Sequence, residues 1–379
     1  MGFISKIPAK GLWLILTAFA VIAALAVVMI TTSHEKSNPL TKAELSPIEK
    51  VAPKGTSSLF LTPATQDWWG FVTAMAPSEY YVKGLNFSES GVQPERFGYV
   101  SSINTSEEAK SGGPVKIIYV EAKTADDANK FAEWILSKKN AYSTMGFMVK
   151  DNIVAITQGW AANDESVFPN ETLASNDSYT TDTKVASRDN TIGFAYLDMG
   201  KSTESLEQTK DPAVAKKLDE FFKLQFGLDI HKGSWVGHAA GPNTLWVGET
   251  NNINIDSNGI DTGKAKELLA SFKKIQMQTP EYSISEENES VLFSALLLSI
   301  KDKSSDEDKK NFNETFAAYN DVFSKAGFDE NNSIFRGAVQ TSPLEYVLSG
   351  LPQKDSGMKG VVFAAKNGEM AFGFIRNVQ

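Results

Sequence analysis

The sequence contains no cysteine, and it holds few histidines and arginines. Without cysteine the protein has no disulfides, no thiol nucleophile, no iron–sulfur cluster, no cysteine-ligated zinc and no lipid-modified cysteine. Only three residues are histidine, and arginine occurs at four positions in a chain with a net charge of −9. An acidic, arginine-poor chain argues against nucleic acid as a partner, and the fold depends on core packing alone.

One long apolar run lies near the N-terminus, where Gly11–Ile30 carry no charge. At about 1.5 Å per residue, a helix of this length spans the roughly 30 Å hydrocarbon core of a bilayer. A cleaved signal peptide is the alternative, with Lys6 and Lys10 as its basic start and Ala24-Leu25-Ala26 as its cleavage site. The apolar run continues past that site to Ile30, so its length favours an uncleaved anchor.

The charges around this run predict the orientation of the chain. Lys6 and Lys10 precede it without any acid, whereas lysines and glutamates are mixed after it. The positive-inside tendency then places the N-terminus in the cytoplasm and the large C-terminal part outside it. Without those two lysines the chain carries 35 basic and 46 acidic side chains, a net charge of −11. We expect a single-pass membrane protein of the cell envelope, and the lack of cysteine favours a bacterial one.

Composition divides the chain into six parts. A polar stretch with prolines 39, 47 and 53 predicts a stalk, and the polar residues Ala161–Asn190 predict a long loop or linker. The predicted parts are a cytoplasmic N-terminus (1–10), a transmembrane helix (11–32), a proline-containing stalk (33–56), a first α+β unit (57–160), a polar linker (161–190) and a duplicated α+β domain (191–379).

An internal repeat occupies the C-terminal half. GLDIHKGSWVG, from Gly227, aligns without gaps with GFDENNSIFRG, from Gly327. An apolar strand candidate (191–200, 291–300) and an amphipathic helix candidate (211–226, 306–326) precede each copy. The repeat unit is therefore a strand, a helix, a Gly-[Leu/Phe]-Asp helix stop with glycine as left-handed cap, and a second strand.

A weaker third copy lies at the front, with Gly84-Leu85-Asn86 as its helix stop between a helix at 67–82 and a strand at 97–103. Hairpins are predicted around Lys150-Asp151-Asn152 and at Asn367-Gly368. Hairpins mixed with helices predict an α+β fold of repeated strand-helix-strand units, with mainly antiparallel sheets and helices packed on one face.

The anchor, the proline stalk, the duplicated α+β units and the repeated helix stops together resemble a family of uncharacterised, single-pass, membrane-anchored bacterial proteins with duplicated extracytoplasmic α+β units. The shared motifs are structural, and the family carries no established activity. The resemblance therefore implies a location and a fold, and it assigns no functional residue.

Two groups of residues are candidate metal ligands. Asp229, His231 and His238 surround the second strand of one repeat, but the other repeat has Asn331 and Ala338 where the histidines stand. A histidine on a strand more often packs against neighbouring residues than binds a metal ion. The second group is Asn254, Asp256 and Asn258, whose oxygen ligands are spaced as at the start of a calcium loop. The acid expected at position 12 of such a loop is missing, and a strand followed by a turn explains the pattern as well.

The adjacent Trp68 and Trp69 cannot share one helix face, which makes one of them a candidate for a partner surface, although core packing of at least one is expected. No nucleophile elbow, P-loop or dinucleotide fingerprint occurs, and no cofactor is expected. We expect a non-enzymatic, membrane-anchored protein that binds a partner or serves as an accessory or scaffold component of an envelope complex. The alternatives are a lipid or small-molecule binding module and, third, a carboxylate-dependent envelope hydrolase.

Overall fold

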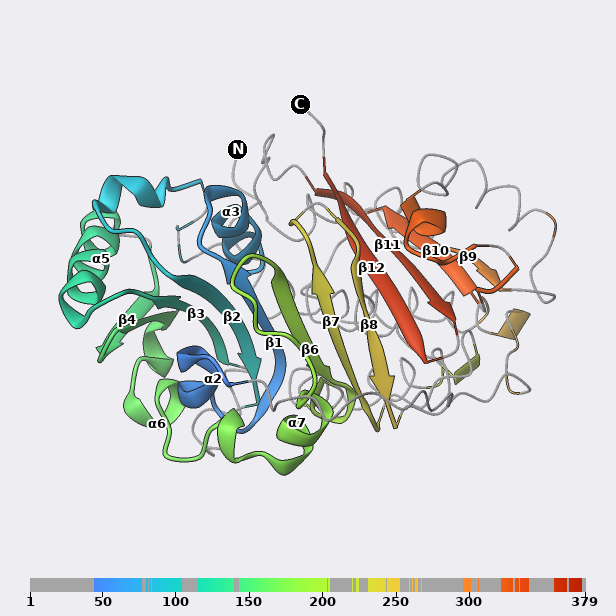
Figure 1. Ribbon diagram of the computed structural model, residues 1–379, viewed down its shortest axis with the longest axis horizontal. Helices are drawn as coiled ribbons and strands as arrows, with labels where there is room; N and C mark the ends of the chain where they lie inside the picture. The colour runs from blue at the N-terminus through green and yellow to red at the C-terminus, as the bar shows by residue number, and fades with distance from the viewer. Residues whose placement is uncertain are drawn as a thin grey trace, which may run out of the picture. The chain divides into compact units, whose positions relative to one another are not determined.

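The computed structural model describes two stretches of chain rich in strands, together with short helices (Figure 1). The described residues are 44–76, 80, 82, 84–103, 115–139, 143–202, 231–242, 244–252, 296–300, 322–329, 331–333, 335–340, 358–366 and 368–376, with isolated positions at 204, 220, 223–224, 259, 261, 263–264, 267 and 306. The predicted transmembrane helix and most of the predicted helices 211–226 and 306–326 lie outside them. None of the helices within these ranges is long and apolar enough to cross a membrane.

The chain divides into two compact units. Of the described residues, the N-terminal unit holds those within Glu35–Gln208 and Val236–Pro242, and the C-terminal unit holds those within Thr209–Trp235 and Asn243–Gln379. All nine strand pairings with a described register are antiparallel. The predicted α+β class with antiparallel sheets is therefore confirmed.

The strands of the N-terminal unit follow the order β4-β5-β3-β2-β1-β6, and β7, whose residues 236–239 belong to this unit, comes next. Its strands are β1 (Thr56–Pro63), β2 (Arg96–Ser102), β3 (Val115–Glu121), β4 (Met145–Lys150), β5 (Ile153–Gln158), β6 (Gly193–Asp198) and β7 (Ser234–Ala239). The predicted hairpin is confirmed, because β4 and β5 meet at Asp151, whose φ of 53° suits a tight turn.

Two helices cover one face of this sheet: α3 (Gln66–Ala74) and α5 (Ala125–Lys138) (Figure 1). Thr65 and Thr124 cap them by accepting hydrogen bonds from backbone N–H groups of the first turn. Trp69 joins both helices to the sheet, with its ring 5.0 Å from that of Phe97 and 5.9 Å from that of Phe131.

Shorter helices cover the opposite face, so the prediction that helices pack on one face is wrong for this unit (Figure 1). They are α2 (Pro47–Val51), η3 (Gly159–Ala161), α6 (Asp164–Val167), η4 (Leu173–Ser175) and α7 (Asp177–Asp182). The strands carry apolar side chains on both faces, and every residue of β1 and β2 is buried. A sheet of this kind requires a layer on each side.

The second layer comes from segments whose composition is mostly polar. Within the predicted linker, a few large side chains are buried in the core, among them Val167, Phe168, Leu173 and Tyr179. The predicted stalk also ends earlier than expected, because Ser46 forms a capping box with Glu49 and Ile48 is fully buried. Residues 46–56 are therefore part of the folded unit.

In the C-terminal unit the strand order is β8-β12-β11-β10-β9. Its strands are β8 (Trp246–Asn251), β9 (Leu296–Ile300), β10 (Phe335–Gln340), β11 (Met358–Lys366) and β12 (Glu369–Arg376). Phe372 lies between two tryptophans, with ring centroids 5.0 Å from Trp235 and 6.1 Å from Trp246. The predicted C-terminal hairpin is confirmed by the pairing of β11 with β12.

The repeated helix stop is a Schellman motif where the structure describes it. Gly327 has φ +80°, Phe328 N–H donates to the Phe323 carbonyl at 2.8 Å, and Gly327 N–H donates to that of Ser324 at 3.0 Å. Asp329 then accepts hydrogen bonds from the N–H groups of the next turn.

The front copy shares two features with this motif. Gly84 has φ +76°, and the Asn86 side chain accepts a hydrogen bond from Ser88 N–H at 3.2 Å. The described helix α3 ends at Ala74, however, and Leu85 N–H donates to the Val82 carbonyl at 3.4 Å, so the backbone at Gly84 differs from the helix stop at Gly327.

Gly98 on β2 sets how closely α2 approaches the sheet. A Cβ atom there would lie 3.0 Å from the Ile48 Cγ2 atom, and Ile48 is fully buried. We expect Gly98→Val to lower the free energy of unfolding by about 1–3 kcal/mol through overpacking. Urea unfolding of the purified full chain measures this. Gly70→Ala is the control, because that site on α3 is open, and we expect it to raise stability by about 0.5–1 kcal/mol. Equal effects of the two changes would contradict the close approach.

Candidate functional site

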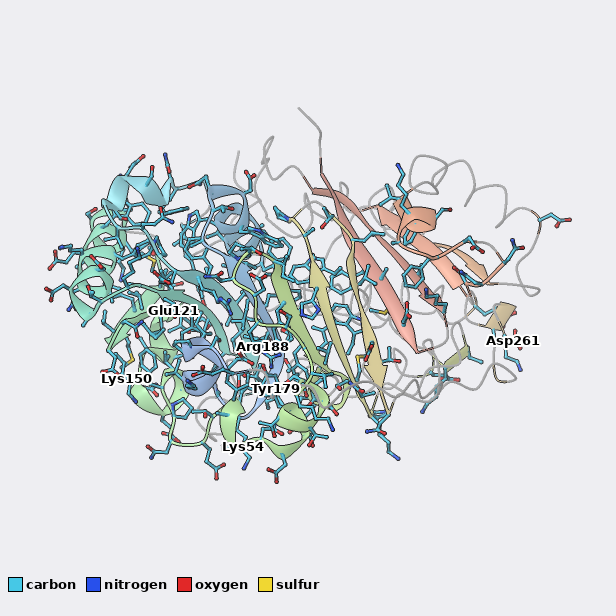
Figure 2. All side chains as sticks on the ribbon, in the orientation of Figure 1. Lys54, Glu121, Lys150, Tyr179, Arg188 and Asp261 are labelled. Atoms are coloured by element: carbon cyan, nitrogen blue, oxygen red, sulfur yellow. The ribbon has the colours of Figure 1, made fainter. Side chains whose placement is uncertain are left out.

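A buried ion pair lies on the α2 face of the N-terminal unit. The carboxylate of Glu49, fully buried, accepts hydrogen bonds from Arg188 Nε at 2.9 and 3.2 Å. It also accepts one from Ser46 N–H at 2.8 Å and one from the Tyr179 hydroxyl. Figure 2 shows Tyr179 and Arg188 close together beside α2. We call Glu49, Arg188 and Tyr179 the clamp.

The rest of the arginine is held by the loop before β6. Arg188 Nη1 donates to the carbonyls of Thr183 at 3.1 Å and Ala186 at 2.6 Å, and the guanidinium lies 4.2 Å from the ring centre of Phe194. Arg188 Nη2 is buried and has no hydrogen-bond partner among the residues that the structure describes. Arg96 on β2 donates to the Arg188 carbonyl at 2.6 Å.

The electrostatics of the clamp favour a structural role. Burial, and next the negative charge of Glu49, raise the pKa of Tyr179 well above its ordinary value, so the phenol remains a proton donor. Burial lowers the pKa of Arg96, and Glu121 opposes that shift. Since both carboxylate oxygens of Glu49 are fully engaged, this group holds α2 against residues 179–188 and leaves no lone pair for a substrate.

A second polar cluster surrounds Lys116 on β3. Its ammonium donates to Ser101 Oγ, on the neighbouring strand, at 2.7 Å, and both residues are buried. The Lys116 backbone N–H donates to Gln158 Oε1 at 3.1 Å, while the Tyr80 hydroxyl donates to the Lys116 carbonyl at 2.8 Å. Burial lowers the pKa of Lys116 to about 8.

A lysine with this pKa beside a serine hydroxyl has the residue types of a serine–lysine nucleophile pair. Both side chains are enclosed, however, with exposed fractions of 5% for Lys116 and 4% for Ser101. Sequence reasoning did not single out Lys116. The signal was present, because this lysine precedes Ile118 and Val120 on one face of an apolar strand.

The predicted partner surface at Trp68 and Trp69 is not on the surface. Both indoles are buried, Trp68 with an edge-on contact to Phe71 and Trp69 within the core described above.

The predicted metal ligands fall in different environments. His238 is half-buried on β7, with Nε2 2.9 Å from the Ser187 carbonyl and its ring 5.6 Å from that of Phe194. It therefore packs beside the clamp. His231 is an exposed turn residue. Asp229, Asn254, Asp256 and Asn258 lie outside the described residues. Within the part of the chain that is described, no group of three or more histidine, aspartate and glutamate side chains could hold a metal ion.

Removing the charge of Glu49 tests the clamp. We expect Glu49→Gln to lower the free energy of unfolding by about 3–5 kcal/mol, because it leaves the Arg188 charge buried and uncompensated. Glu171→Gln is the matched control, since its ion pair with Lys54 is exposed, and we expect less than about 1 kcal/mol there. Urea unfolding of the full chain measures both. Similar losses for the two variants would show that the clamp contributes no more than a surface pair.

Lys116 predicts a pH-dependent stability. Its pKa is about 8 in the folded protein and roughly 10.4 in an unfolded chain, so between these values the unfolded chain binds more protons and stability rises with pH. Below pH 8 the penalty of the buried charge is complete, at about 3 kcal/mol. Lys116→Met removes it. We therefore expect the gain in the free energy of unfolding of the variant over the original chain to be larger at pH 7 than at pH 10. Urea unfolding at the two pH values measures this. A gain that does not change with pH would contradict the lowered pKa.

No protein-family model, no curated protein and no solved structure matches this chain.

Proposed function

We propose that this chain is a non-enzymatic, single-pass protein of the cell envelope whose extracytoplasmic α+β part binds a partner protein or serves as a scaffold in a membrane complex. The observation that carries the proposal is the uncharged apolar run Gly11–Ile30, long enough to span a bilayer, followed by a folded and strongly acidic remainder.

The distance between that run and the folded unit supports a fixed position near the membrane. Residues 31–45 separate Ile30 from the helix cap Ser46. Fifteen residues span at most about 50 Å when fully extended. The N-terminal unit would therefore be held within that distance of the bilayer.

The clamp gives this tether a firm attachment. The first described helix after the apolar run is α2, and Glu49 within it is bonded to Arg188, which is 139 residues later in the sequence. A force on the N-terminal tether would act on α2, and the buried Glu49–Arg188 ion pair would resist it. Such an arrangement suits a protein whose folded part is kept in place by its anchor.

The interior of the N-terminal unit favours a surface function over chemistry. Both faces of its sheet are covered, the carboxylate of the clamp is fully bonded, and the Lys116–Ser101 pair is enclosed. Partner binding through the surface requires none of these groups to be accessible. It therefore fits the described residues better than a ligand held between sheet and helices.

The absence of cysteine gives a direct test of topology. A single cysteine can be placed at Val185, whose exposed fraction is 52%, or at Lys6 before the apolar run. We expect a membrane-impermeant maleimide, applied to the outside of intact inner membranes, to label the Val185→Cys variant and to leave the Lys6→Cys variant unlabelled until the membrane is opened. Labelling of Val185→Cys only after opening would contradict an extracytoplasmic domain.

Co-purification tests the partner. The full chain, solubilised from native membranes in mild detergent, is expected to bring down one or more proteins in fixed stoichiometry. Recovery of the chain alone, or with a stoichiometric lipid detected by mass spectrometry, would contradict partner binding.

A further inference from the structure

Strand β4 is the terminal strand in the order of the N-terminal sheet, with β5 on one side (Figure 1). Along β4, the backbone N–H and C=O groups of successive residues point alternately toward β5 and away from it. The Asn152 carbonyl points toward β3, because it accepts a hydrogen bond from Ala122 N–H at 2.9 Å. By the same alternation, the backbone N–H and C=O groups of residues 153, 155 and 157 in β5 point toward β4. Their partners in β4 are Lys150, Met148 and Gly146. The N–H and C=O groups of Met145, Phe147 and Val149 therefore face outward.

The outward groups of Met145 are already engaged. Its N–H donates to Ser143 Oγ at 3.4 Å, and its carbonyl accepts from Lys139 Nζ at 3.0 Å. Phe147 and Val149 have no such partner among the described residues. Four backbone groups, two on each residue, are thus open on this edge.

The side chains around these groups lack the usual protection of an edge strand. Exposed edges normally carry charges, proline or bulges that prevent pairing with another strand. The run Met145–Val149 has no charge and no proline, and Phe147, Met148 and Val149 are each only half-buried. A strand placed against this edge would bury all three.

The open groups are self-complementary. A two-fold axis at Met148 pairs Phe147 of one copy with Val149 of a second copy in antiparallel register, and the reverse pair forms at the same time. The four open groups of each copy then bond to the four of the other. The engaged groups of Met145 are not needed.

Charge favours the same register. It places Asp151, exposed at the tip of the hairpin, opposite Met145 of the second copy, whose carbonyl holds the Lys139 ammonium. Lys150 falls opposite Gly146, so no like charges face each other across the pair. Figure 2 shows Lys150 beside the β4 edge.

We infer that β4 is an interface at which two copies of this chain pair edge to edge, with Phe147 of each copy hydrogen-bonded to Val149 of the other. The interface is short, and a common membrane anchor would strengthen it by raising the local concentration of the two edges. This goes beyond the proposed partner binding and does not depend on it.

Disulfide trapping tests the register in a chain without cysteine. At the two-fold axis, the two copies of residue 148 form a non-hydrogen-bonded pair with Cα atoms about 4.5 Å apart, within the range that a disulfide bridges. We expect Met148→Cys in the full chain, in native membranes under mild oxidation, to form a reducible dimer at least tenfold more than Val185→Cys, the exposed control. We also expect Val149→Lys, added to Met148→Cys, to lower the dimer yield at least tenfold. Thermal unfolding of this double variant in detergent checks that it is folded.

Several results would overturn the inference. Dimer yields of Met148→Cys no greater than those of Val185→Cys would exclude an edge-to-edge pair. A yield unchanged by Val149→Lys in a folded chain would indicate random collision. An adduct shown by mass spectrometry to hold a different protein would assign the edge to a heterologous partner. A higher yield from Phe147→Cys than from Met148→Cys would contradict the proposed register.

Discussion

The N-terminal unit depends on covering both faces of one sheet, and the Glu49–Arg188 ion pair holds the second cover in place. That face is covered by short helices, none of which has more than six residues. Helices this short are not stable alone and need tertiary contacts. The ion pair, with the Tyr179 hydroxyl and the Ser46 cap, joins the first of these segments to the last. Without a bonded partner, neither charge would be tolerated where it lies.

Two kinds of buried polar group occur in the unit, and they have different consequences. In the clamp, an acid and a base neutralise each other and every carboxylate oxygen is bonded. Lys116, by contrast, bonds to a neutral hydroxyl at Ser101, and its pKa falls because burial disfavours the charge. The first arrangement gives strength at neutral pH. The second carries a cost at neutral pH that other packing must offset, which makes Lys116 the more unusual residue.

The open edge of β4 has a similar physical basis. Antiparallel pairing satisfies the backbone only on one side of a terminal strand, so the other side is left to water, to a side chain or to another strand. Here Lys139 and Ser143 satisfy Met145, while Phe147 and Val149, which lie within an apolar run, have no outward backbone partner among the described residues. The proposed membrane anchor would confine copies of the chain to one plane, and pairing of such edges would then be more favourable than it is in free solution.

The sequence alone determined the features that depend on local chemistry. The left-handed backbone of Gly84, the helix stop at Gly327, the hairpin at Asp151 and the antiparallel α+β class follow from backbone preferences of glycine, asparagine and aspartate and from apolar periodicity. The apolar run Gly11–Ile30 remains a prediction from composition.

Long-range packing, in contrast, determines which polar segments are folded and which aromatic residues are buried. The segment Ala161–Asn190 has the composition of a linker, yet a few well-spaced side chains are enough to cover one face of the sheet. Nothing in the neighbouring sequence indicates that this face needs a cover. The burial of both Trp68 and Trp69, the clamp and the lowered pKa of Lys116 likewise depend on residues distant in sequence. Periodicity identifies which side of an element is apolar. Long-range packing determines which element covers that side, and local sequence patterns do not predict it.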